Sequence, residues 1–71
     1  MTPDEVRAHR KTLGLTQARL AEAMRKSLRA IKYWEDDDAP ERQRITASDA
    51  ILLLYMVKFG LPEAALRGRL K

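Results

Sequence analysis

A cationic segment, RKSLRAIKYW, runs from Arg25 to Trp34. Its four cations, with no acid among them, are Arg25, Lys26, Arg29 and Lys32. Guanidinium and ammonium groups bind phosphate oxygens, and an arginine fork also matches the O6 and N7 atoms of guanine. Leu28, Ile31 and Trp34 recur through the same segment at helical spacing. The segment therefore predicts a helix that buries an apolar face and turns a cationic face toward a polyanion.

Helical periodicity divides this segment, about two turns long, into two faces. The outer face comprises Arg29, Lys32, Tyr33 and Asp36, at spacings i, i+3, i+4 and i+7. Ile31 and Trp34 lie on the opposite side together with Glu35, and Leu28 lies between the two faces. Ser27 is a suitable N-cap for this helix. The short RKS connection requires the preceding helix to pack across it, as in two helices joined by a tight turn.

The flanking segments also carry helix signals. Thr2 is the expected cap of a first helix that begins with Pro3 and closes at Gly14, and Thr16 is the expected cap of a second. The inner face of the second helix is Leu20, Ala21 and Met24. A fourth helix, ASDAILLLYMVKF, begins after Thr46 or Ser48 and ends at Gly60, and a fifth spans LPEAALRGRLK. With no alternating strand pattern, the sequence predicts an all-α, compact bundle of about five short helices.

Length and charge narrow the classes of function. A chain of 71 residues forms one domain with a small core. Residues 1–35 carry eight Lys/Arg and four Asp/Glu (8 − 4 = +4), whereas residues 36–71 carry six of each (6 − 6 = 0). Positive charge confined to one half favours a polyanionic partner there.

The expected location is the cytoplasm. The chain has no cysteine, and its start lacks the apolar region of a signal peptide. The longest apolar run, AILLLYMV, has eight residues, and a membrane span needs about 20. We expect no membrane association, no cofactor and no metal, since His9 is the single histidine. We also expect no enzyme, because no nucleophile–base pair, carboxylate dyad or phosphate loop is present.

The stretch LTQARLAEAMRKSLRAIKYWE, residues 15–35, resembles the helix-turn-helix of the lambda repressor and Cro family, also called XRE-like. The matching residues are Leu15, Thr16, Gln17, Leu20, Ala21, Ser27, Ile31, Trp34 and Glu35. We expect a single domain over residues 1–71, with a helix-turn-helix at about 16–36 and dimerisation helices at about 47–70. Two features depart from the family pattern. Arg25 and Lys26 replace a glycine and an aliphatic residue in the turn, and an acidic DDD replaces a glycine and basic residues after the third helix.

The resemblance also implies roles for individual residues. Leu28, Arg29, Lys32 and Tyr33 match the positions that read base edges, with Leu28 and Tyr33 against a thymine methyl group; Leu28 is equally expected to be the edge of the core. The implied phosphate contacts are Thr16, Gln17, Arg25, Lys26, Ser27, Arg42, Gln43 and Arg44. For Thr16 and Gln17 the alternative is structural, as a cap and as a support for the third helix. Arg10 and Glu35 match a structural ion pair between the first helix and the end of the third.

The fourth helix is apolar all round, so both of its sides must be covered. The expected dimer-interface residues are Ile51, Leu52, Tyr55, Met56, Phe59, Leu66 and Leu70. The alternative is that the fifth helix of the same chain covers this surface. Two-fold symmetry of a dimer predicts a palindromic operator with half-sites about 34 Å apart.

The function expected from these features is a sequence-specific transcriptional regulator, a homodimeric repressor that binds double-stranded DNA through the major groove. The resemblance is consistent with autoregulation of its own operon, in a phage or mobile element, such as an anti-CRISPR-associated regulator. One alternative is a DNA-binding antitoxin that also binds a toxin. The other is a protein-interaction module without DNA binding, which the DDD loop and the absent turn glycine favour.

Overall fold

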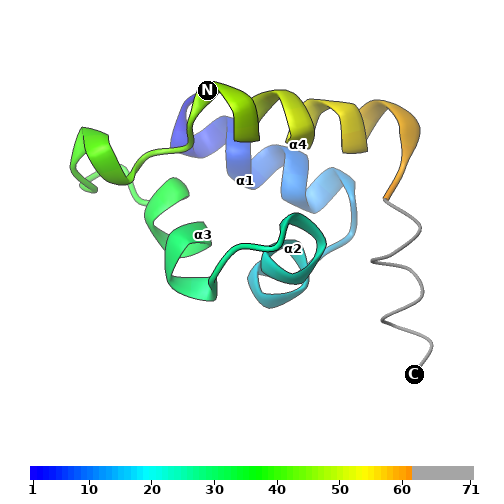
Figure 1. Ribbon diagram of the computed structural model, residues 1–71, viewed down its shortest axis with the longest axis horizontal. Helices are drawn as coiled ribbons and strands as arrows, with labels where there is room; N and C mark the ends of the chain where they lie inside the picture. The colour runs from blue at the N-terminus through cyan, green and yellow to red at the C-terminus, as the bar shows by residue number, and fades with distance from the viewer. Residues whose placement is uncertain (62–71) are drawn as a thin grey trace.

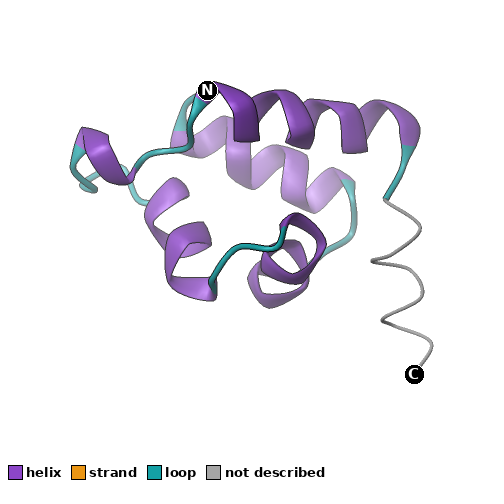
Figure 2. Cartoon of the chain, in the orientation of Figure 1, coloured by secondary structure: helices purple, strands orange, loops and turns teal. Residues whose placement is uncertain are grey.

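A computed structural model of the protein describes residues 1–61, and in this range it is all-helical, without a strand (Figures 1 and 2). The elements are α1 (Pro3–Thr12), α2 (Gln17–Met24), α3 (Leu28–Trp34), the 3₁₀ helix η1 (Glu41–Gln43) and α4 (Ala47–Phe59). The predicted all-α class is confirmed over this range. The predicted fifth helix, including Leu66 and Leu70, lies outside the described residues.

Each α-helix begins at a hydroxyl-bearing cap. The side chains of Thr2, Thr16, Ser27 and Thr46 each accept a hydrogen bond from the backbone N–H three residues on, at 3.0–3.2 Å. These bonds satisfy N–H groups that have no partner within the helix. All four starts agree with the sequence prediction, and Thr46, rather than Ser48, is the cap of α4.

The first two helices end in the same way, although on different residues. Gly14 has φ +70°, and the Leu15 N–H donates to the Arg10 carbonyl at 3.2 Å. Arg25 has φ 55° and ψ 44°, and the Lys26 N–H donates to the Ala21 carbonyl at 2.8 Å. Both arrangements place a left-handed residue after the helix and close a six-to-one backbone bond. The turn before α3 therefore forms without glycine.

The core lies where the four α-helices meet. The fully buried side chains are Val6, Leu20, Ile31, Leu53 and Met56. Helix α4 lies alongside α1, and α2 contacts both α3 and α4 (Figure 1). Each of the four helices contributes buried residues to this common cluster, and the shared packing fixes the position of α3 relative to α2. No helix in residues 1–61 combines the length and apolar character needed to cross a membrane.

Candidate nucleic-acid interface

Helix α3 has one buried and one exposed face, as its periodicity predicts. Ile31 and Trp34 are 0% and 5% exposed and join the core. Arg29 and Lys32 are exposed on the opposite side, and Tyr33 is half-buried. Leu28 is 41% exposed, so its side chain lies outside the core cluster rather than within it. The exposed side chains are thus carried by a helix whose other face is fixed in the core.

The end of α3 is fixed by a buried ion pair. Arg10 Nε and Nη2 donate to the two carboxylate oxygens of Glu35 at 2.7 and 3.0 Å, which is a bidentate arrangement. The Glu35 side chain is 4% exposed and that of Arg10 is 15% exposed. Arg10 Nη1 also donates to the Leu15 carbonyl at 3.0 Å. The expected contact between Arg10 and Glu35 is therefore present and ties α1 to the end of α3, while the bond to Leu15 ties α1 to the segment before α2.

Two further residues complete this polar network. The Gln17 amide donates to Glu35 Oε1 at 3.3 Å, so Gln17 supports α3, as one of its two expected roles requires. Arg7 Nη2 donates to the Glu35 backbone carbonyl. This role of Arg7 was not predicted, because its partner is 28 residues away and no local sequence pattern joins the two. Every buried side-chain nitrogen and oxygen in the described residues has a partner.

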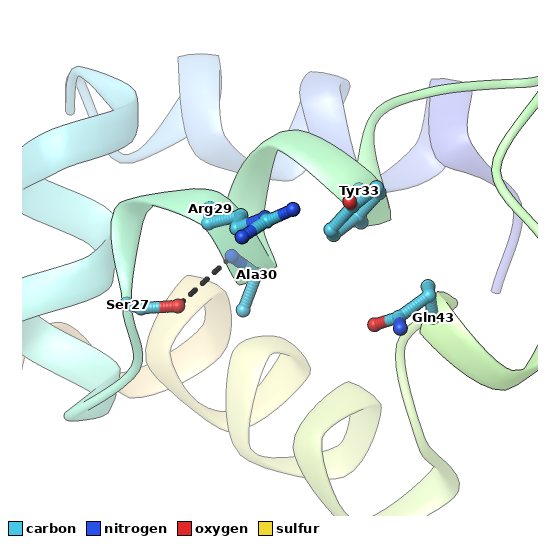
Figure 3. Close-up of a pocket in the computed structure, with 5 residues that line it drawn as sticks. All are labelled: Ser27, Arg29, Ala30, Tyr33 and Gln43. Atoms are coloured by element: carbon cyan, nitrogen blue, oxygen red, sulfur yellow. Dashed lines mark hydrogen bonds between the residues drawn. The ribbon is translucent and has the colours of Figure 1, made fainter.

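A hollow of about 400 Å³ separates α3 from η1 (Figure 3). Its lining residues are Ser27, Arg29, Ala30, Tyr33 and Gln43. The lining contains one cation and no acid, and Arg29 and Tyr33 lie across the hollow from Gln43 (Figure 3). The Arg29 guanidinium carbon lies 5.7 Å from the centre of the Tyr33 ring. Two residues expected to read bases, Arg29 and Tyr33, and two expected to contact phosphate, Ser27 and Gln43, are therefore brought to one concave site.

The cations near α3 differ in what they contact. Within residues 1–61, Arg25, Arg29, Lys32 and Arg42 make no ion pair. Lys26 Nζ, in contrast, lies 3.2 Å from Asp49 Oδ2 at the start of α4. This pairing of Lys26 with Asp49 was not predicted, since no sequence periodicity relates the two segments. Of the expected phosphate ligands, Arg25 and Arg42 are therefore available, and Lys26 is already paired.

The acidic loop after α3 has a defined conformation. Arg44 donates to the backbone carbonyls of Ala39 and Asp37, at 3.4 and 3.0 Å. The Asp36 carboxylate accepts the Asp38 N–H at 2.9 Å. Arg44 was expected to contact phosphate, but its guanidinium is engaged in holding this loop. The carboxylates of Asp37 and Asp38 remain exposed, and neither forms an ion pair with another described residue.

Helix α4 carries an exposed apolar surface. Four of its exposed side chains form an outer stripe: Ile51, Leu52, Tyr55 and Phe59. Their exposed fractions are 68%, 38%, 59% and 65%, respectively. Tyr55 and Phe59 pack their rings together at 4.7 Å between centroids. Met56, which was predicted to lie in a dimer interface, is fully buried in the core. That prediction was wrong, because α1 and α2 cover the side of α4 on which Leu53 and Met56 lie.

Comparison with known proteins found no matching family model, no matching curated protein and no matching solved structure. Among residues 1–61, no three histidine or carboxylate side chains gather as a metal site requires. The site is thus defined by its own geometry, as an exposed cationic face on α3 beside a hollow.

Proposed function

We propose that the chain is a sequence-specific DNA-binding transcriptional regulator that acts as a dimeric repressor. In this proposal α2 and α3 form a helix-turn-helix, and α3 enters the major groove of B-DNA, which is about 12 Å wide. The observation that carries the proposal is the outer face of α3, where Arg29 and Lys32 are exposed without an ion pair among the described residues. A cationic surface of this kind, held rigidly by a buried inner face, suits DNA, whose phosphates carry negative charge and whose base edges are exposed in the groove.

The arrangement of α2 and α3 supports this reading. Three residues connect the two helices, and the helices pack against each other. In the proposed complex Arg29 binds a guanine edge, Lys32 binds a base or phosphate, and Leu28 contacts a thymine methyl group. Arg25 and Arg42 flank this face and would contact phosphates, which contribute affinity without sequence information.

The outer stripe of α4 supports the dimer. Ile51, Tyr55 and Phe59 repeat every four residues along one side of the helix, and each is more than half exposed. Packing this side against the same side of a second copy would remove a large apolar surface from water. In the proposed dimer, a two-fold axis relates two α3 helices that lie on successive turns of DNA, about 34 Å apart.

Repression in this proposal requires no chemistry. The dimer occupies an operator that overlaps a promoter and excludes polymerase. The proposed operator lies upstream of the protein's own gene, as in the self-regulating operons of phages and mobile elements. The site of action is the cytoplasm of a bacterial or infected cell.

Fluorescence anisotropy tests the proposal. The full chain is titrated onto a labelled duplex from upstream of its own gene and onto a scrambled duplex, across a series of salt concentrations. Selective binding to the native duplex is expected, with log K falling by about 0.9 for each phosphate contact per unit of log salt. Arg29→Ala is expected to reduce the selectivity, because the contact to one guanine is lost while Leu28 and Lys32 remain. Lys11→Ala, which removes an exposed cation from α1, is the matched control and is expected to preserve it. Equal, weak binding to both duplexes contradicts the proposal.

A second candidate function is an antitoxin that binds DNA and also neutralises a partner protein. The same exposed stripe on α4 favours it, because that surface suits a protein as well as a second copy. Co-expression with the product of the adjacent gene distinguishes the two. A stable complex that forms with wild type and is lost in Tyr55→Ala supports the antitoxin, and a homodimer alone supports the repressor.

A further inference from the structure

The contact between Arg29 and Tyr33 points to a division of roles within the proposed DNA-reading face. This inference rests on the proposed function and deepens it. The two residues are four apart on α3, so their side chains lie one above the other on the same face. The guanidinium carbon of Arg29 lies 5.7 Å from the centroid of the Tyr33 ring, within the range of a cation–π contact.

The two partners differ in how firmly they are held. Arg29 is exposed, whereas Tyr33 is half-buried. Tyr33 also lies between Lys32 and Trp34, and Trp34 is only 5% exposed, so the backbone at Tyr33 is fixed by the core. The ring is therefore the fixed partner, and the long arginine side chain is the one whose orientation the contact restricts.

The hollow gives this orientation a direction. Arg29 and Tyr33 form one wall, Gln43 lies opposite them, and the small side chain of Ala30 leaves space between (Figure 3). A guanidinium held along this wall faces open space rather than another protein group. An unrestrained arginine loses rotamer freedom when it binds, and restraint before binding avoids that loss.

We propose that Tyr33 is a positioning residue for Arg29: its ring holds the guanidinium beside the hollow, oriented to meet the O6 and N7 atoms of one guanine. Tyr33 reads no base of its own in this arrangement. The role differs from the thymine-methyl contact that the sequence resemblance implies for this residue. Arg29 and Tyr33 then act as a unit at a single base pair.

The test is selection from a duplex library with randomised bases, using the full chain, four variants at Arg29 and Tyr33, and one control variant at Gln43. Arg29→Ala is expected to erase the preference for guanine at one position. Tyr33→Leu, which removes the ring but keeps an apolar side chain, is expected to reduce that same preference about three- to tenfold. Tyr33→Phe keeps the ring and is expected to preserve it. The double variant with Arg29→Ala and Tyr33→Leu is expected to match Arg29→Ala alone.

Gln43→Ala is the control from the opposite wall of the hollow. Because Gln43 is an expected phosphate contact, the Gln43→Ala variant is expected to bind all sequences more weakly by a similar factor. If Tyr33→Leu leaves the guanine preference intact, or removes preference at a different position, the positioning role is wrong. A circular dichroism melting curve for each variant establishes that each one is folded under the conditions of the selection.

A measurement without DNA separates this inference from the proposed function. The Hδ protons of Arg29 are expected to shift upfield in the NMR spectra of wild type and Tyr33→Phe, and to return to ordinary values in Tyr33→Leu. Absence of the ring-current shift in wild type overturns the positioning role, whatever DNA is selected. If the shift is present but wild type enriches no sequence, the proposed function fails and the readout role fails with it.

Discussion

Arg10 and Glu35 form a bidentate ion pair across 25 residues of sequence, with Nε–Oε2 and Nη2–Oε1 distances of 2.7 and 3.0 Å. The carboxylate is almost fully buried, and Arg7 and Gln17 bring further donors to the same residue. The pair joins α1 to the end of α3, the helix that presents the proposed DNA-reading face. Its integrity therefore affects both folding and the orientation of that face.

Removing either partner of this pair is expected to destabilise the fold strongly. Arg10→Ala leaves the Glu35 carboxylate buried with too few donors, at an expected loss of about 3–5 kcal/mol in the free energy of unfolding. Urea denaturation followed by circular dichroism measures the loss. Arg19→Ala is the control, because its pair with Glu22 is exposed on both sides and is worth about 0.2–1 kcal/mol. Equal losses in the two variants would show that the buried pair is not the stabilising feature.

The left-handed conformation of Arg25 predicts a gain from glycine. An L-residue at φ 55° is strained, and glycine is not. Arg25→Gly is therefore expected to be more stable than Arg25→Ala by about 1 kcal/mol, as measured from urea midpoints. Both variants lose the guanidinium, so the comparison isolates the backbone term. If Arg25 contacts phosphate, both are expected to bind DNA more weakly by the same factor, despite their different stabilities.

Adjacent residues on α4 are expected to differ in their effects. Met56→Ala leaves a cavity in the core and is expected to cost about 2–5 kcal/mol of stability. Tyr55→Ala changes a side chain that is 59% exposed, so its expected effect on unfolding at low protein concentration is within about 0.5 kcal/mol. Under the proposed dimer, Tyr55→Ala instead weakens self-association in sedimentation velocity. A Tyr55→Ala variant as unstable as Met56→Ala would contradict this assignment of faces.

Asp49 is expected to restrain Lys26. Asp49→Asn removes a negative charge from the first turn of α4 and also removes the ion-pair partner of Lys26. The Lys26 side chain is 39% exposed, so solvent screens the pair and the expected loss of stability is about 0.5–2 kcal/mol. Under the proposed function the freed Lys26 gains a phosphate contact, and the salt slope of DNA binding steepens by about 0.9. Asp4→Asn is the control, since Asp4 also lies in a first turn and pairs with Arg7 in the open. An unchanged slope in Asp49→Asn would mean that Lys26 does not reach the DNA.

The capping box of α1 predicts a pH dependence. The Thr2 backbone N–H donates to Glu5 Oε1 at 3.0 Å, and this hydrogen bonding lowers the pKa of the Glu5 carboxyl below its ordinary value. A lowered folded-state pKa means that the contribution to stability is present above the unfolded pKa and is lost as pH falls through the folded pKa. The melting temperature of wild type is expected to exceed that of Glu5→Ala at pH 7, and the gap is expected to narrow in the acidic range. A gap independent of pH would exclude the charged form of Glu5 as its source.

Local sequence signals predicted the helices well. The caps at Thr2, Thr16, Ser27 and Thr46 act on N–H groups three residues away, so neighbouring residues alone determine them. The inner face of α3 followed from the spacing of Ile31 and Trp34 for the same reason. The contact between Arg10 and Glu35 was expected only through resemblance to a family, since no spacing rule connects positions so far apart.

The sequence by itself determined where the helices begin, which side of α2 and α3 is buried, and that a mostly cationic face lies on α3. These are properties of local backbone bonding and of periodicity, which short stretches of chain contain in full. Tertiary structure decided which side of α4 faces the core, because residues 51–57 are apolar in every direction and contain no periodicity to read. It also decided that Lys26 meets Asp49 and that Arg44 holds the acidic loop. Such contacts depend on how whole helices and loops pack. A surface cation has a long, flexible side chain that could reach several carboxylates or carbonyls, and only the packing decides which of them lies beside it.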